Sequence, residues 1–172
     1  DCGVYKNGFH GDSAFTFPIC EVAPDVKKLL QVTFNSLSLG IEKAIVGNRV
    51  GDIGFAIQSY CEFTHKFGVV HDLVGHGVGK ELHEEPQVPN YGKRGKGPIL
   101  QEGLVIAIEP MINMGKKDVY TAEDKWTVNT NDHKMSAHYE HTVWVRLDDA
   151  EALTRHDWCE EAIKMNKELI FV

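Results

Sequence analysis

The first residues of the chain alternate between apolar and polar positions in a way that predicts a β-hairpin. Residues 1–17 flank the dipeptide Asn7-Gly8, which is typical of tight turns between antiparallel strands. The pattern therefore predicts a strand, a turn and a second strand. Asp1 and Asp12 then fall on opposing arms of this hairpin.

The next part of the chain shows helical periodicity. Apolar residues recur with the 3.6-residue period after Pro24, and this stripe predicts a helix that ends at Gly47. A second apolar stripe follows directly. We expect Asp52 to cap that second helix and Gly68 to close it.

The second half of the chain favours strands. Residues 69–115 are rich in Gly and Pro and contain short apolar runs, such as residues 104–108, that predict sheet strands. A further hairpin is expected within residues 119–146, where residues 142–145 are β-branched and aromatic. The tail predicts a short helix over residues 157–169, with Asp157 as its cap.

Composition restricts the class of protein. The chain has 172 residues, of which 42% are hydrophobic and 25% charged, values that fit one globular domain over residues 1–172 and exclude disorder. A net charge of −7 repels phosphate backbones, so nucleic acid is not expected as a direct partner. No run approaches the roughly 20 apolar residues of a membrane helix, so we expect no membrane partner.

The cysteines indicate a reducing compartment. Cys2, Cys20, Cys61 and Cys159 are widely spaced and form no Cys-x-x-Cys pair, which suits reduced thiols better than disulfides or a zinc ribbon. The cytoplasm is therefore the expected location. The basic cluster at residues 93–96 lies among glycines and reads as a solvated loop or, less readily, as an anion site.

Two histidines are candidates for chemistry. His76 lies within Gly75–Gly79, where the glycines allow close backbone approach and leave the imidazole unobstructed. His83 follows seven residues later, a separation that suits two loop or strand residues facing one cavity. Structural or surface roles are the alternative for both.

Two glutamates at strand ends extend this set. Glu109 follows an apolar run and Glu140 precedes a strong strand; each is either turned to water or held by a partner, because desolvating a lone charge is costly. With Asp1, Asp12 and His76 they form an oxygen-rich set with a single nitrogen. Carboxylates ~4 Å apart repel by roughly 4 kcal/mol per pair at an effective dielectric of about 20, so the set favours two divalent cations. Ligand softness favours manganese, iron, cobalt or zinc.

At these residues the sequence resembles the methionine aminopeptidases, specifically the type I, bacterial-like branch. The order and spacing of six blocks match over about residues 1–154. The matching blocks are Asn7–Asp12, Gly75–Gly79, His83–Val88, Ile108–Asn113, Trp126–Val128 and Tyr139–Val143. No long insertion is present between Glu109 and Glu140 or in the helical region, which argues against the type II branch.

The resemblance implies a site that holds two divalent metal ions (Co, Mn, Fe or Zn). By position, Asp1 holds one ion, His76 and Glu109 hold the other, and Asp12 and Glu140 bridge both. The implied activity is metal-dependent removal of the N-terminal methionine from nascent proteins with a small second residue. Nascent N-termini are then the partners, and the resemblance leaves open whether the protein meets them at the ribosome.

The resemblance also implies catalytic and substrate-binding roles. Glu109 helps to take the proton of the attacking water, and His83 contacts the scissile amide or stabilises the oxyanion. Part of the methionine slot is expected from Leu82, Met111 and Trp126, with ordinary core packing as the alternative. His138 is a further candidate for contact with the rim of the site, and the alternative is that it has no part in the site.

The fold implied by the resemblance is an α+β fold of the pita-bread type, a curved antiparallel sheet with helices on its outer face. We expect it to be incomplete at the N-terminal side, because a type I enzyme carries roughly another half-domain before the position of Asp1. An inactive fold-mate that binds peptide N-termini or a protein partner is the alternative function. A related Xaa-Pro peptidase is a further alternative.

Overall fold

The computed structural model describes residues 1–166, 168 and 169 of the chain. The helical elements are α1 (Pro24–Ile41), α2 (Val50–Gln58), the π-helix η1 (Ser59–Thr64) and α3 (Asp157–Met165). The strands of the first half are β1 (Val4–Lys6), β2 (Phe9–Gly11), β3 (Ser13–Ala14), β4 (Gly68–Val69), β5 (Gly75–Gly77) and β6 (Glu84–Val88). Those of the second half are β7 (Val105–Ile108), β8 (Met111–Asn113), β9 (Val119–Thr121), β10 (Val128–Thr130), β11 (Ser136–His138), β12 (Glu140–Val145) and β13 (Ala150–Ala152).

The strands form antiparallel sheets, and β12 pairs with three other strands, β3, β7 and β13. The largest sheet has six strands in the order β13, β12, β7, β5 and β6, with β3 paired to the start of β12. A three-stranded sheet has the order β11, β8 and β4, and two hairpins pair β1 with β2 and β9 with β10. The hairpin expected around Asn7 and Gly8 is confirmed as β1 and β2. A hairpin also forms within residues 119–146, from β9 and β10, but the expectation that residues 142–145 belong to it is wrong, because β12 pairs with β7, β13 and β3 in the largest sheet.

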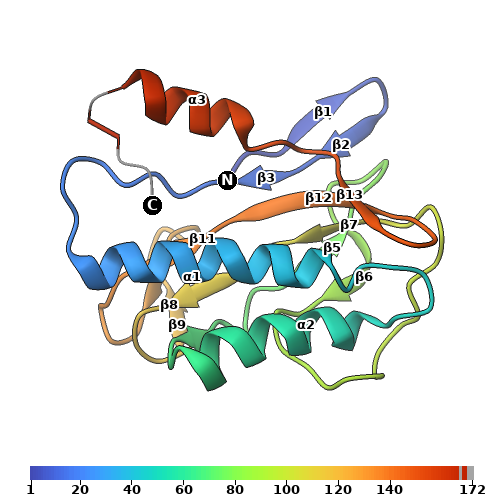
Figure 1. Cartoon of the computed structure of the whole chain (residues 1–172), viewed down its shortest axis with the longest axis horizontal. Helices are drawn as coiled ribbons and strands as arrows, with labels where there is room; N and C mark the ends of the chain where they lie inside the picture. Colours follow the sequence, from blue (N-terminus) through green and yellow to red (C-terminus); the bar gives the residue numbers. More distant parts are fainter. Residues whose placement is uncertain (167, 170–172) are drawn as a thin grey trace.

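The hydrophobic core lies between the sheets and the first two helices. In Figure 1, α1 and α2 lie on the same side of the strands, and α3 packs at the opposite edge, near the N-terminal hairpin. Helix α1 contributes Leu29 and Leu37 to the core, and the facing strands contribute Ile106, Ile108 and Val143. All five side chains are at most 1% exposed.

Helix α1 ends at Ile41, six residues before the predicted end at Gly47. The chain stays close to the sheet there, because the N–H of Val46 donates to the carbonyl of Arg146 and the N–H of Gly47 to that of Leu100. These bonds to distant segments replace the next helical turn. Gly47 has a φ of 90°, a left-handed conformation that suits glycine.

The boundaries of the other two helices also differ from those expected. Asp52 is not the N-cap of α2 but lies three residues inside, where its Oδ2 accepts the N–H of the N-cap Arg49 at 2.8 Å. The helical segment ends as the π-helix at Thr64, and Gly68 belongs to β4. Helix α3 has Asp157 as its first residue rather than its cap, and it ends at Met165 instead of residue 169. None of the described helices has the length and hydrophobicity needed to cross a membrane.

A stacked histidine pair joins the strand β12 to the segment before α3. The rings of His141 and His156 lie 3.8 Å apart between centroids, and the edge of Phe15 packs against His156. Burial and the nearby His156 lower the pKa of His141 to about 4. The His141 ring also contacts the hydroxyl of Thr154 through Nδ1 at 3.0 Å.

The first prediction concerns the pH dependence of stability. Because the folded-state pKa of His141 lies below its ordinary value of 6.5, the unfolded chain binds a proton first as the pH falls, and stability is lost between pH 6.5 and pH 4. Between pH 7 and pH 5, we expect the free energy of unfolding of the His141→Gln variant to fall by about 2 kcal/mol less than that of the parent. Urea denaturation of both metal-free proteins measures this difference. The variant His133→Asn, at an exposed position, should keep the parental slope, and equal slopes for His141→Gln would contradict the prediction.

Candidate metal centre

The alternation of side chains along two strands places two glutamates on the face away from the helices. On β7, Ile106 and Ile108 point into the core, so Glu109, the next residue, leaves toward the other side. On β12, Val143 faces the core, whereas Glu140 lies on the opposite face. Glu109 and Glu140 are nevertheless 7% and 1% exposed. The fold thus buries two carboxylates behind its apolar layer.

His76 lies on β5 between two glycines that have no room for side chains. A Cβ at Gly75 would meet the carbonyl oxygen of Ala107, and one at Gly77 would meet that of Glu85. The expectation that these glycines permit close backbone approach is therefore confirmed. The Nδ1 of His76 lies 2.9 Å from the carbonyl oxygen of Gly77. Donation by Nδ1–H there leaves the lone pair of Nε2 free for a ligand.

Asp12 follows the hairpin and is held by a side chain from the distant strand β12. The hydroxyl of Thr142 accepts the N–H of Asp12 and donates to its carbonyl oxygen, both at 2.8 Å. The two hairpin arms are tied together where the N–H of Cys2 donates to the carbonyl of Ser13 at 2.9 Å. Asp1 and Asp12 consequently lie on opposing arms, as predicted. Asp1 is exposed and lines the same cleft as the buried ligands.

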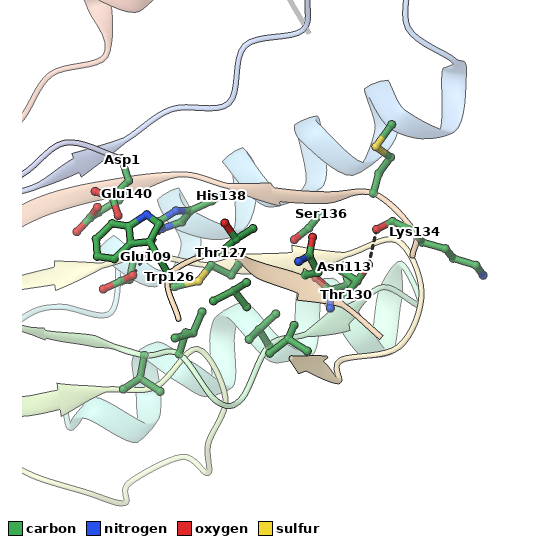
Figure 2. A pocket seen from close by; sticks show the side chains of 18 of the residues that line it. Asp1, Glu109, Asn113, Trp126, Thr127, Thr130, Lys134, Ser136, His138 and Glu140 are labelled. Atoms are coloured by element: carbon green, nitrogen blue, oxygen red, sulfur yellow. Dashed lines mark hydrogen bonds and ion pairs between the residues drawn. The ribbon is translucent and has the colours of Figure 1, made fainter. Parts of the chain in front are cut away.

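Three of the five predicted ligands converge closely. Among the described residues, Asp12, His76 and Glu140 each offer one ligand atom within 4.8 Å of the other two. Glu109 joins from the side, because its Oε1 lies 3.4 Å from the Nε2 of His76. Figure 2 shows Asp1, Glu109 and Glu140 toward the same end of the cleft. The structure therefore gathers residues that are far apart in sequence, from β5 and β12 and from the positions directly after β2 and β7.

The buried carboxylates of this cluster repel one another, and a positive charge between them would stabilise them. Burial, followed by the charges of Glu109 and Asp12, raises the pKa of Glu140 to about 9, and the N-terminal ammonium opposes this shift. The Oε1 atom of Glu140 is buried and has no hydrogen-bond partner among the described residues. Carboxylate oxygens and an imidazole lone pair are all acceptors, so they repel unless protons or a cation lie between them. The donor set and its orphaned oxygen thus fit a divalent ion.

The cleft beside the cluster is open and mixed in character. Its volume is about 910 Å³, and it is lined by His83, Met111 and Trp126 among others. The ring of His83 packs edge-on against His76, with centroids 4.3 Å apart. Trp126 is 87% exposed. Leu82 lies outside the residues that line this cleft, close enough to Gly3 to contact a Cβ placed there.

Sequence reasoning missed two residues that support the ligands. Thr142 was visible only as a β-branched strand residue, and its bonds to Asp12 join residues 130 positions apart. Asn90 is fully buried and donates through Nδ2 to the carbonyl of Glu109 at 3.0 Å. Neither partner could be found from local pattern. His138, whose contact with the site was left open, lies in the cleft with its Nε2 3.5 Å from the Oε2 of Glu109.

Comparison with known proteins identifies close relatives. Residues 1–146 match metallopeptidase family M24. The chain is 51% identical over 154 residues to a methionine aminopeptidase of Clostridium perfringens, covering 90% of this chain and 61% of the relative. It is 50% identical over 155 residues to methionine aminopeptidase 1 of Bacillus subtilis, covering 90% of this chain and 62% of the relative.

Solved structures give the same picture. The methionine aminopeptidase of Rickettsia prowazekii superposes with a TM-score of 0.86 at 42% identity, covering 89% of this chain and 62% of that one. The enzyme of Thermotoga maritima gives a TM-score of 0.87 at 42% identity, covering 89% and 61%. The expected α+β fold of the pita-bread type, with its antiparallel sheet and outer helices, is thereby confirmed. The chain spans about three fifths of the length of these relatives.

The second prediction tests the crowding of carboxylates at Glu140. Because the folded-state pKa of Glu140 lies above its ordinary value of 4.5, stability falls as the pH rises from 4.5 toward 9, where the unfolded chain has already released its proton. In the presence of chelator, we expect Glu140→Gln to raise the free energy of unfolding at pH 8, with a gain that shrinks toward pH 5. Urea denaturation measures both values. A control at an exposed carboxylate, Glu102→Gln, should show no such gain, and an unchanged or lowered stability of Glu140→Gln at pH 8 would rule the prediction out.

Proposed function

The chain belongs to metallopeptidase family M24, and from this premise we propose that it is a metal-dependent aminopeptidase. Its proposed substrate is the N-terminal methionine of nascent proteins whose second residue is small. The observation that carries the proposal is the convergence of Asp12, His76 and Glu140 within 4.8 Å. Identity of 50–51% to methionine aminopeptidases over 154–155 residues supports the choice of substrate.

We propose that five residues hold two divalent ions. Asp1 binds one ion, and His76 and Glu109 bind the other. Asp12 and Glu140 would be shared by both ions, which fits their position within 4.8 Å of each other and of His76. Manganese, iron, cobalt and zinc all suit carboxylate and imidazole ligands, so the identity of the ions follows their availability as well as affinity.

The chemistry divides between these ions and the side chains. When bound, the ions lower the pKa of a water molecule, polarise the scissile carbonyl and bind the free α-amine of the substrate. Glu109 accepts the proton of the attacking water, for which its buried carboxylate is well placed. His83 donates a hydrogen bond to the scissile amide or the developing oxyanion, a contact of the kind that lowers a barrier by about 2.7–4 kcal/mol.

Substrate selection is assigned to the apolar part of the cleft. Met111 and Trp126 line it, and we propose that they contact the methionine side chain, with Leu82 at its edge. We propose that the site accepts only a small side chain at the second residue of the substrate. The whole of residues 1–172 is proposed to act as one catalytic domain.

The proposed setting is the cytoplasm, where nascent N-termini become available. All four cysteines lie in the described part of the chain and are free thiols, which supports a reducing compartment.

One observation favours a second candidate, an inactive fold-mate that binds peptide N-termini. Trp126 in the cleft is 87% exposed, so the mouth of the cleft is open to water, whereas catalysis in such a site is favoured when water is excluded from it. The Xaa-Pro peptidase alternative has less support. A prolidase of Pyrococcus furiosus shares the fold at 22% identity and a TM-score of 0.67, and likeness at that level speaks for the fold alone.

The third prediction separates the enzyme from the binding module by metal content. We expect the chain, loaded with Mn²⁺ or Co²⁺ and dialysed, to retain two equivalents of ion. The Glu140→Ala variant should lose both together, because Glu140 bridges them. Elemental analysis by mass spectrometry gives the stoichiometry, and Glu102→Ala should retain two equivalents. Peptide binding that persists in chelator, with no retained metal, would favour the inactive fold-mate.

The fourth prediction concerns activity. With Mn²⁺ or Co²⁺ present, we expect the 172-residue chain to hydrolyse a Met-Gly-type peptide weakly, because the mouth of the cleft, where Trp126 is 87% exposed, is open to water. His83→Ala should lower any measurable kcat by about 10²–10³-fold. A panel that includes Met-Leu and Ala-Pro peptides tests the small second residue and the Xaa-Pro alternative. Turnover on the order of 1–10³ s⁻¹ would overturn the expectation of weak activity.

A further inference from the structure

Two imidazoles flank the carboxylate of Glu109 from opposite oxygens. The Nε2 of His76 lies 3.4 Å from Oε1, and the Nε2 of His138 lies 3.5 Å from Oε2. The His138 Nε2 atom is itself buried and has no hydrogen-bond partner among the described residues. A free donor position and a carboxylate oxygen therefore face each other. Figure 2 shows His138 beside Glu109 at the same end of the cleft as Glu140.

The backbone of His138 is fixed on both sides, so its ring has a defined place. In β11 it pairs with Met111 of β8, two residues beyond Glu109. On the other side, its N–H donates to the hydroxyl of Thr16 at 3.1 Å, and that hydroxyl donates to its carbonyl oxygen at 2.7 Å. The ring is about a quarter exposed, whereas the carboxylate of Glu109 is 9% exposed.

We propose that His138 is a positioning residue that orients the carboxylate of Glu109. Its Nε2–H donates to Oε2 and thereby leaves Oε1 on the side of His76. The inference rests on the proposed function only in giving Glu109 a role as metal ligand and proton acceptor. The 3.5 Å approach of Nε2 to Oε2 is found in the metal-free chain, so the proposed hydrogen bond can be tested without metal.

A physical need for such a donor follows from the side chain of Glu109. The terminal torsion of a glutamate is broad and nearly two-fold, so rotation exchanges the two oxygens at little cost. A buried carboxylate oxygen without a donor is also poorly solvated. A single hydrogen-bond donor at Oε2 would address both problems, because it supplies that oxygen with a partner and fixes the plane of the carboxylate. Partners of this kind behind a metal ligand typically change metal affinity 10–100-fold.

The tautomer of His138 gives a test that needs neither metal nor activity. In the metal-free chain with ¹⁵N-labelled histidine, we expect the NMR spectrum to show a proton on Nε2 of His138, hydrogen-bonded to the carboxylate. The variant Glu109→Gln should shift that Nε2 resonance. A proton on Nδ1 alone, with a bare Nε2, would overturn the proposal, as would a His138 spectrum indifferent to Glu109→Gln.

Metal binding and kinetics supply the second test. We expect His138→Ala to weaken the binding of Mn²⁺, measured by calorimetry, by about tenfold or more. His138→Gln should stay close to the parent, because its amide also presents an N–H donor. His133→Asn removes another imidazole of the cleft and should leave the affinity unchanged. Equal affinities for the parent and His138→Ala would refute the proposal.

The same variants separate this inference from the proposed function. If the parent hydrolyses peptide, His138→Ala should lower kcat with little change in KM, and His138→Gln should restore most of kcat. If no peptide is hydrolysed, the tautomer and the metal affinity still decide the role of His138. Failure of Ala and Gln variants to differ in metal affinity would count against positioning, even where the enzyme is active.

Discussion

The candidate site depends on a buried cluster of hydrogen-bond acceptors, of which the Oε1 atom of Glu140 has no donor among the described residues. Asp12, His76 and Glu140 present ligand atoms within 4.8 Å of one another, and Glu140 is 1% exposed. At this depth water cannot screen the carboxylates, and the rise in the pKa of Glu140 to about 9 expresses the cost of ionising it there. The cost is relieved by a proton or by a cation. Because a divalent ion carries more charge than a proton and takes several oxygens at once, ion binding and the stability of this cluster are linked.

The same strands build the core and the cluster, which explains how the acceptors are held at close range. On β12, Val143 faces helices α1 and α2 while Glu140 faces the cleft, and on β7 the core residue Ile108 precedes Glu109. Moving the backbone of either glutamate would require a shift of a strand whose core residues, Ile108 and Val143, are fully buried. The carboxylates therefore stay close together despite their mutual repulsion, whereas carboxylates on separate loops would move apart. Packing on the core face of the strands fixes the positions of the charged residues on the other face.

The parts of the fold that the sequence predicted are those specified by local pattern. The turn at Asn7 and Gly8, the strand of residues 142–145 and the start of the helix at Pro24 follow from residue propensities and spacing. Helix ends were wrong wherever a distant segment competes for the backbone, as at Gly47, whose N–H bonds to Leu100. The π-helix before Gly68 has no sequence signature of the kind that marks a cap.

The residues of the candidate site also differ in how far local sequence predicts them. Its acidic and histidine members are recognisable because their residue types are unusual at strand ends and between glycines. The groups that orient them are not. Thr142 resembles any β-branched strand residue, and its bonds to Asp12 arise when the hairpin folds onto β12. Local sequence identifies the ligand types, whereas tertiary structure determines which neighbour fixes each ligand.

The proposed metal ligands and the proposed substrate-binding residue Trp126 differ in how deeply they are buried in the cleft. Glu109, Glu140 and His76 are less than 9% exposed, so low effective dielectric strengthens their interaction with an ion. Trp126 lines the same cleft but is 87% exposed, and a side chain in bulk water contributes little fixed shape to a substrate pocket. The proposed metal binding therefore depends on the buried strands, whereas the proposed substrate selection depends on how far the mouth of the cleft is covered.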